Sequence, residues 1–166
     1  GFVGLELVGE VNYQSKSHFP SNPILSFLEQ YRDPQKKQTL FENGGYEMLK
    51  EPAVFNCPYD SLPYALASHD LNPIHRCPNF ATLAELPEGR TIVHGTWTAA
   101  KARGIVEKEA CDGAAERLRA YEVEVVDMVF QGEELSVTLQ HVGVIDGRLL
   151  LNVLVHKSVT GETVLK

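Results

Sequence analysis

The sequence predicts an α+β domain in which one long helix is wrapped by an antiparallel β-sheet. A helical pattern covers residues 96–110, and strand patterns follow it along the chain. Three candidate strands follow the helix, at residues 118–130, 135–145 and 149–156. Asp146-Gly147 separates the last two strands, and this dipeptide suits a tight hairpin turn that needs positive φ. An amphipathic helix and a hairpin-connected sheet can bury their apolar faces against each other.

The first 52 residues are predicted to flank the core domain. Residues 2–13 alternate loosely between apolar and polar side chains and predict a strand. Residues 24–31 place apolar side chains at i, i+3, i+4 and i+7 behind a first-turn proline, which predicts a short helix. Residues 33–50 are polar and are interpreted as a connector. We expect a core domain at residues 53–166, with residues 1–52 as its flank or as part of a neighbouring unit.

The core domain begins with a mildly apolar segment at residues 61–68, which suits a helix or a strand. Asn72-Pro73 ends this segment, because a residue before proline avoids helical backbone angles. Glu88-Gly89 marks a second turn before the long helix. That helix carries apolar residues on one side and charges on the other. Its apolar surface is assigned to Trp97, Ala99, Ala100, Gly104, Ile105 and Val106.

Composition and charge exclude several classes of function. The formal net charge of −7 makes an acidic surface that repels phosphate backbones, so no nucleic-acid partner is expected. No run approaches the roughly 20 apolar residues that span a bilayer. Three cysteines without CxxC spacing and the lack of an Asn-x-Ser/Thr acceptor predict a reducing, cytoplasmic location. The chain has no basic-then-apolar leader and no initiating Met, so we expect a piece of a longer protein.

Residues 70–75 bring an acid and a base into one short loop. Asn72-Pro73 makes the chain turn, so the polar ends of Asp70, Asn72 and His75 can converge. A carboxylate beside an imidazole forms an acid/base pair, and partial burial can bring either pKa toward neutrality. Such a pair can hold one water molecule, which suits adding water to a double bond or removing it.

His94-Gly95-Thr96 stands at the start of the predicted long helix. The first N–H groups of a helix have no partner within the helix and carry its positive dipole end. Gly95 has no side chain to keep a ligand away. A thioester carbonyl bound there would have its developing enolate charge stabilised. Together with the Asp70/His75 pair, this helix start predicts a β-elimination site.

The run Asp70-Leu-Asn-Pro-Ile-His75, followed by Ile92-Val-His-Gly95, resembles the MaoC-like family of (R)-specific enoyl hydratases and 3-hydroxyacyl dehydratases. Members of that family have a hot-dog fold. Within the family, the chain is most similar to the dehydratase region of the fungal-type fatty acid synthase β subunit. The segments that carry this similarity besides the motif are residues 22–28, 124–129 and 140–148.

The resemblance implies dehydration of (R)-3-hydroxyacyl thioesters to trans-2-enoyl thioesters on the phosphopantetheine of an acyl carrier protein. It implies that Asp70 and His75 form the catalytic pair, that Asn72 braces the loop, and that the Gly95 N–H binds the thioester oxygen. It implies no metal and no bound cofactor. It also implies an adjacent hot-dog unit of the same synthase, or a homodimer partner, that shares the acyl tunnel.

Several alternatives stay open beside these roles. His94 is interpreted as a hydrogen-bonded structural residue in preference to a catalytic one, and Trp97 as a core residue on a helix that borders the acyl tunnel. His69, His75, Cys77 and His94 fit no usual zinc-ligand spacing, so no metal site is expected. The alternative functions are an (R)-specific enoyl-CoA hydratase, a non-catalytic structural or acyl-binding hot-dog module, and a thioesterase.

Overall fold

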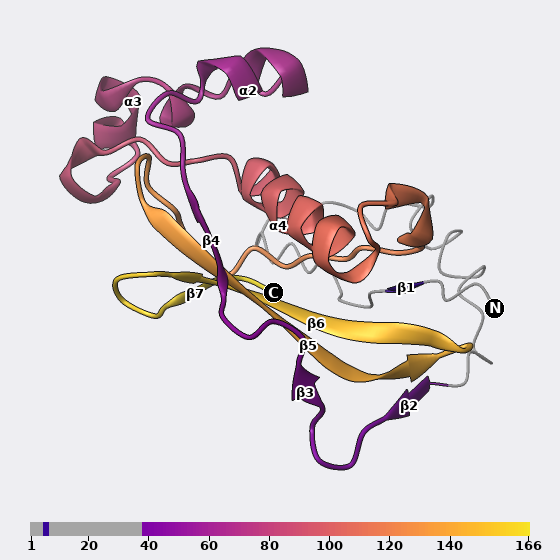
Figure 1. Ribbon diagram of the computed structural model, residues 1–166. Helices are drawn as coiled ribbons and strands as arrows, with labels where there is room; N and C mark the ends of the chain where they lie inside the picture. Colours follow the sequence, from indigo (N-terminus) through magenta and orange to yellow (C-terminus); the bar gives the residue numbers. More distant parts are fainter. Residues whose placement is uncertain (1–4, 7–37) are drawn as a thin grey trace, which may run out of the picture.

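The computed structural model describes residues 5–6 and 38–166 of the chain (Figure 1). The helix predicted at residues 24–31 lies outside the described residues. Of the strand predicted at residues 2–13, the described part is β1, Leu5–Glu6, which pairs in parallel with β6.

A long antiparallel hairpin forms the centre of the sheet, as the sequence predicts. Its strands are β5, Glu134–Ile145, and β6, Arg148–Lys157. Asp146 and Gly147 at the turn have φ values of 48° and 76°, the positive angles that this dipeptide tolerates. The register shifts once, between His141 and Gly143.

Four short strands complete the described sheet around this hairpin (Figure 1). Three of them pair antiparallel with β5: β2, Gln38–Leu40; β3, Tyr46–Glu47; and β4, Ala53–Asn56. β7, Thr163–Leu165, pairs with the other hairpin strand, β6. The interpretation of residues 33–50 as a connector is therefore wrong for β2 and β3. These strands have three and two residues, too few for an alternation of apolar and polar side chains to appear.

The strand predicted at residues 118–130 is also wrong. This segment forms only two isolated bridges, Val125 with Leu165 and Phe130 with Ile92. Glu124 and Lys166 exchange two backbone hydrogen bonds of 2.6 and 3.1 Å, so the segment does run beside the chain end. The neighbouring strand β7 has only three residues, which leaves no length for a regular ladder. The apolar residues of the alternation do not share one buried face, because Tyr121 and Val123 pack against the core whereas Val125 is 51% exposed.

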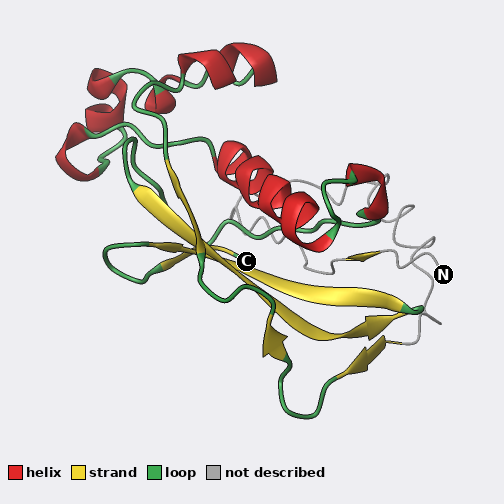
Figure 2. Cartoon of the chain, viewed as in Figure 1, coloured by secondary structure: helices red, strands yellow, loops and turns green. Residues whose placement is uncertain are grey.

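Helix α4, Gly95–Ala110, packs against one face of the sheet (Figure 2). Its buried residues are Thr98, Ala102 and Val106, one per turn. The predicted apolar surface is thus partly wrong, because Ala100 and Gly104 are exposed. These two residues are small, and small residues do not reveal from the sequence which helix face is buried.

Two short α-helices and two three-residue 3₁₀ turns connect β4 to α4 and lie beyond one end of the sheet (Figure 2). They are α2, Leu62–Ser68; η1, Pro73–His75; α3, Pro78–Leu83; and η2, Pro87–Gly89. The segment at residues 61–68, predicted as helix or strand, is a helix. A further turn, η3, Ala115–Arg117, follows α4. Within the described residues, the helices are all too short or too polar to cross a membrane.

The core lies between α4 and the inner face of β5. Leu139 on β5 is 0% exposed and belongs to this cluster. We expect Leu139→Ala to lower the free energy of unfolding by about 3 kcal/mol, because it leaves a cavity. Val54→Ala on β4, where the side chain is 56% exposed, serves as the control and should change it by less than about 0.5 kcal/mol. Urea denaturation followed by Trp97 fluorescence measures both; equal losses would contradict the assignment of the core.

Candidate active site

The loop between α2 and η1 is held by its own side chains. The Oδ1 of Asp70 accepts a hydrogen bond from the backbone N–H of Asn72 at 3.2 Å. The Oδ1 of Asn72 in turn accepts from the N–H of Ile74 at 3.3 Å and caps η1. Short polar side chains of this kind form local hydrogen bonds with the backbone in place of regular secondary structure. This arrangement places the Asp70 carboxylate and the His75 ring at the two ends of one tight turn.

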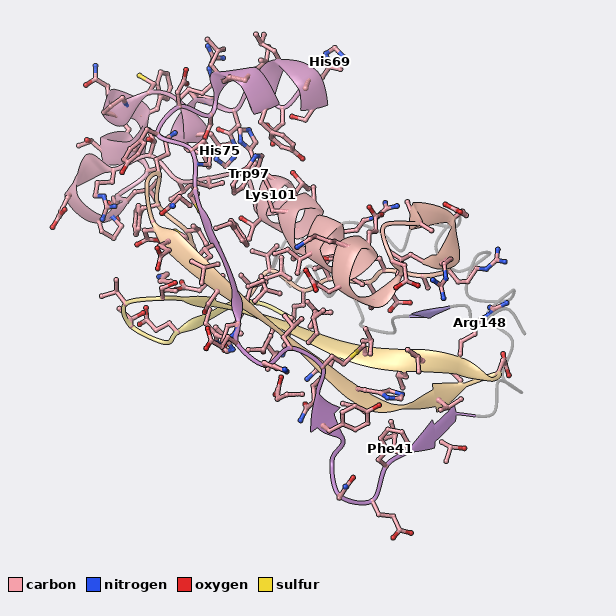
Figure 3. The ribbon with its side chains drawn as sticks, viewed as in Figure 1. Phe41, His69, His75, Trp97, Lys101 and Arg148 are labelled. Carbon is pink, nitrogen blue, oxygen red and sulfur yellow. The ribbon has the colours of Figure 1, made fainter. Side chains whose placement is uncertain are left out.

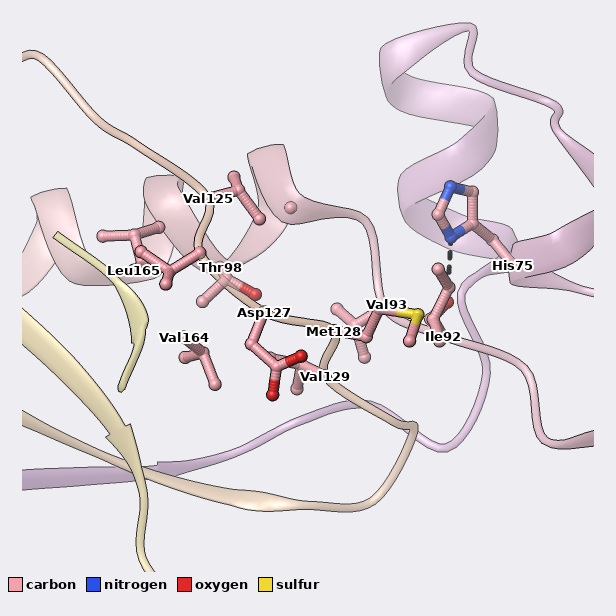
Figure 4. Close-up of a pocket in the computed structure, with 12 residues that line it drawn as sticks. His75, Ile92, Val93, Thr98, Val125, Asp127, Met128, Val129, Val164 and Leu165 are labelled. Carbon is pink, nitrogen blue, oxygen red and sulfur yellow. Dashed lines mark hydrogen bonds between the residues drawn. The ribbon is translucent and has the colours of Figure 1, made fainter. Parts of the chain in front are cut away.

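His75 is nearly buried and its tautomer is fixed by a main-chain contact. The side chain is 8% exposed, and Nδ1 lies 2.9 Å from the carbonyl oxygen of Ile92 (Figure 4). A carbonyl oxygen only accepts, so Nδ1 carries the proton and the lone pair of the neutral ring is on Nε2. Burial is the main cause that lowers the His75 pKa below its ordinary value of 6.5, and His94 adds to the lowering. The Nε2 atom is therefore available as a base.

His94 connects the loop between α2 and η1 to the start of α4. Its ring is 1% exposed and stacks on the His75 ring, with 3.8 Å between centroids and 25° between planes. Its Nε2 donates to the backbone carbonyl of Asp70 at 3.1 Å and lies 3.9 Å from Oδ2 of the same residue. These contacts fit the loop-bracing role that the sequence favours for His94.

Asp70, His75 and His94 form one compact cluster. A carboxylate oxygen and one ring nitrogen from each histidine lie within 4.8 Å of one another. Two hydrogen bonds of about 2.8 Å each can join groups at that separation through a single water or hydroxyl. The same three residue types could ligate a metal.

Gly95 is the first residue of α4 and lies at the wall of a pocket of about 310 Å³ (Figure 4). The first N–H groups of a helix have no acceptor within it, and in α4 these are the N–H groups of Gly95 and Thr96. A Cβ atom on Gly95 would lie 2.9 Å from Cγ2 of Val125, so only glycine fits against this neighbour without a shift. His75 and Thr98 line the same pocket, and Ile92, Val93, residues 125–129 and β7 form the remaining walls.

The structure brings His75 and Gly95 to this pocket, whereas Asp70, Asn72, His94 and Trp97 are not among its lining residues. The Trp97 ring contacts Phe55 of β4 at 5.9 Å between centroids and is absent from the pocket lining. The Lys101 ammonium lies 5.5 Å from the centroid of the same ring. Figure 3 shows His69 at the outer end of α2, away from His75, and its side chain is exposed.

Three features of the site were missed in the sequence. The Ile92 carbonyl that orients His75 is 17 residues away along the chain and carries no side-chain signal. Asp127 lines the pocket, but its carboxylate is paired with Lys157 at 2.8 Å, and this hydrogen bond holds the Asp127 pKa below its usual range. Thr98 lines the pocket from the helix turn after Gly95. Its spacing of three residues from Gly95 was the one available signal.

The chain is similar to several known proteins. The family model "MaoC like domain" matches residues 34–163. The chain is 40% identical to fatty acid synthase subunit beta of Schizosaccharomyces pombe over 163 residues, which are 95% of this chain and 8% of the relative. It is 36% identical to the corresponding subunit of Saccharomyces cerevisiae over 145 residues, 87% of this chain and 7% of the relative. The chain thus spans less than a tenth of these relatives.

Two solved structures support the fold. The R-hydratase PhaJ1 from Pseudomonas aeruginosa has a TM-score of 0.56 at 18% identity, over 79% of this chain and 83% of the other. The peroxisomal multifunctional enzyme type 2 from Drosophila melanogaster has a TM-score of 0.58 at 20% identity, over 81% and 23%. The family match and the relatives support a hydro-lyase of the dehydratase/hydratase type. The chain therefore belongs to the MaoC-like domain family and has the hot-dog fold.

Proposed function

We propose that this chain dehydrates (R)-3-hydroxyacyl thioesters carried on an acyl carrier protein to trans-2-enoyl thioesters, within a multifunctional fatty acid synthase. One observation carries the proposal. A carboxylate oxygen of Asp70 lies within 4.8 Å of a ring nitrogen of His75, and His75 lines a pocket whose wall also includes Gly95 at the start of α4. The similarity to fungal fatty acid synthase β subunits supports the setting.

Asp70 and His75 transfer protons to and from the substrate during the reaction. The lone pair on Nε2 of His75 removes the α-proton, and the electron pair moves onto the thioester oxygen beside the Gly95 N–H. The electrons then return to form the Cα–Cβ double bond as the Cβ–O bond breaks. The leaving hydroxyl takes a proton from the Asp70 carboxyl and departs as water. The proton on His75 then passes to the Asp70 carboxylate, which restores the pair; the reverse sequence is hydration.

The acyl chain would lie in the pocket beyond His75, between α4 and residues 125–129. Most of its described lining is aliphatic, as an acyl chain requires. Val125, Val126 and Met128 form one apolar edge of this pocket and are exposed in the single chain. We propose that an adjacent hot-dog unit of the same synthase, or a second copy of the chain, covers this edge and completes the tunnel.

A product analysis tests the proposal against its alternatives. The complete protein is incubated with (R)-3-hydroxybutyryl thioesters of acyl carrier protein and, separately, of coenzyme A. We expect enoyl thioester to form without release of free thiol, and to form faster on the carrier protein. Thiol release would instead indicate a thioesterase, and a preference for coenzyme A a stand-alone hydratase. No turnover of either substrate would leave a non-catalytic module.

The pH dependence of the reaction follows from the burial of His75. Since burial lowers the His75 pKa below 6.5, more than half of the rings are neutral at pH 6.5, and the inflection of the acid limb of kcat/KM should lie below that pH. The folded state also binds this proton less readily than the unfolded chain does. The free energy of unfolding therefore falls as the pH drops from 6.5 to the folded-state pKa of His75, and below that pKa this histidine causes no further loss. A pH profile of kcat/KM checks the limb. An inflection at or above pH 6.5 would contradict a buried neutral base.

A further inference from the structure

The Thr98 hydroxyl is a buried polar group that the proposed reaction does not yet use. Thr98 is 2% exposed. Among the described residues, two buried side-chain atoms have no hydrogen-bond partner, Oγ1 of Thr98 and Nδ1 of His94. Folded proteins rarely leave a buried hydroxyl unpaired, because its lost hydration is not replaced. Of these two residues, only Thr98 lines the pocket.

The local backbone does not occupy this hydroxyl. A threonine within a helix usually donates to the carbonyl four residues earlier, which for Thr98 is that of His94. The His94 carbonyl instead accepts the backbone N–H groups of Trp97 at 2.9 Å and of Thr98 at 3.3 Å. The hydroxyl proton therefore remains available to a molecule in the pocket.

Thr98 lies near Gly95, so both residues can reach the same end of a bound substrate. The two residues are three apart on α4 and so share one helix face, and helical side chains lean toward the N-terminus. In the view of Figure 4, the Thr98 hydroxyl is on the side of Met128 and His75, whereas its methyl group is on the side of Leu165. The Asp127 carboxylate, which also lines the pocket, is already paired with Lys157.

We infer that the Thr98 hydroxyl donates a hydrogen bond to the thioester oxygen of the bound acyl chain, as a second donor beside the Gly95 N–H. This inference rests on the proposed function. The bond strengthens as the oxygen gains charge in the enolate, so the hydroxyl acts on the rate more than on substrate binding. It also explains why the fold keeps an unpaired hydroxyl where valine would fit.

The test compares two variants of nearly equal shape in the complete protein. Thr98→Val removes the hydroxyl, and we expect kcat for hydration of crotonyl thioester to fall about 10- to 100-fold with little change in KM. Thr98→Ser keeps the hydroxyl and should stay within about threefold of the wild type. The melting temperature of the valine variant should be unchanged or higher, because no hydrogen bond of the fold is lost. A hydroxyl with a purely structural role would give a lower melting temperature instead.

A spectroscopic reading separates this inference from folding effects. The infrared carbonyl stretch of 13C-labelled crotonyl thioester is recorded bound to the Asp70→Asn protein, which holds it without turnover. Adding Thr98→Val should raise that frequency, and adding Thr98→Ser should not; Thr98→Ala replaces the valine variant if the latter does not fold. Unchanged frequency and kcat overturn the inference. A wild-type protein without hydration activity would instead contradict the proposed function.

Discussion

Replacing His75 with asparagine is expected to lower kcat for dehydration by about 10³-fold. The asparagine amide can take the place of Nδ1 and keep the hydrogen bond to the Ile92 carbonyl, which is 2.9 Å long in the wild type. The lone pair of Nε2, which we propose removes the α-proton, is lost. The change therefore removes the base while leaving the loop in place. Steady-state kinetics with (R)-3-hydroxyacyl thioester measure the effect.

His69→Asn is the matched control for this variant. His69 is exposed, lies six positions earlier, and has a φ of 59°, which asparagine tolerates better than most residues. The control should retain wild-type kcat within about twofold, because its ring points away from the pocket. A His75→Asn protein that keeps more than a tenth of the wild-type rate would show that another group removes the proton.

Asp70→Asn is expected to lower kcat by about 10²- to 10⁴-fold with the fold unchanged. The asparagine oxygen can still accept the N–H of Asn72, which holds the loop in its turn. An amide cannot exchange a proton with the leaving hydroxyl, so the Cβ–O bond must break without an acid. The rate is measured alongside the melting temperature.

Asp60→Asn provides the same chemical change at a similar local structure. The Oδ1 of Asp60 accepts the N–H of Leu62 at 2.8 Å, two residues on, as Asp70 does with Asn72. This variant should leave kcat unchanged. If both variants reduced kcat equally, the loss at Asp70 would come from the turn and not from proton transfer.

The sequence predicts the parts of the fold that repeat a period over many residues. The β5/β6 hairpin and α4 are long, and their ends carry clear signals in Asp146-Gly147 and His94-Gly95. The short strands β2, β3 and β7 have two or three residues each, which is too few for a period to appear. The alternation at residues 118–130 does not produce a strand, because the neighbouring β7 has three residues and leaves no length for a regular ladder.

The candidate site likewise has parts that the sequence predicts and parts that depend on tertiary packing. Asp70, Asn72 and His75 lie within six residues, so their convergence follows from a local turn that the sequence indicates. The stacking of His94 on His75 and the Ile92 carbonyl behind the ring depend on tertiary packing. The sequence does not indicate which face of the helix Thr98 lies on, because a threonine suits both an apolar and a charged face. Its importance appears only when the unpaired hydroxyl is seen at the pocket wall.

The most direct test of the Asp70/His75 site is the hydration of crotonyl thioester by the complete protein, with chiral analysis of the 3-hydroxybutyryl product. The wild-type protein is predicted to give the (R)-product alone, and Asp70→Asn and His75→Asn to give almost none, while Asp60→Asn and His69→Asn match the wild type. A wild-type rate that survives in either catalytic variant, or a product of mixed chirality, would contradict the account.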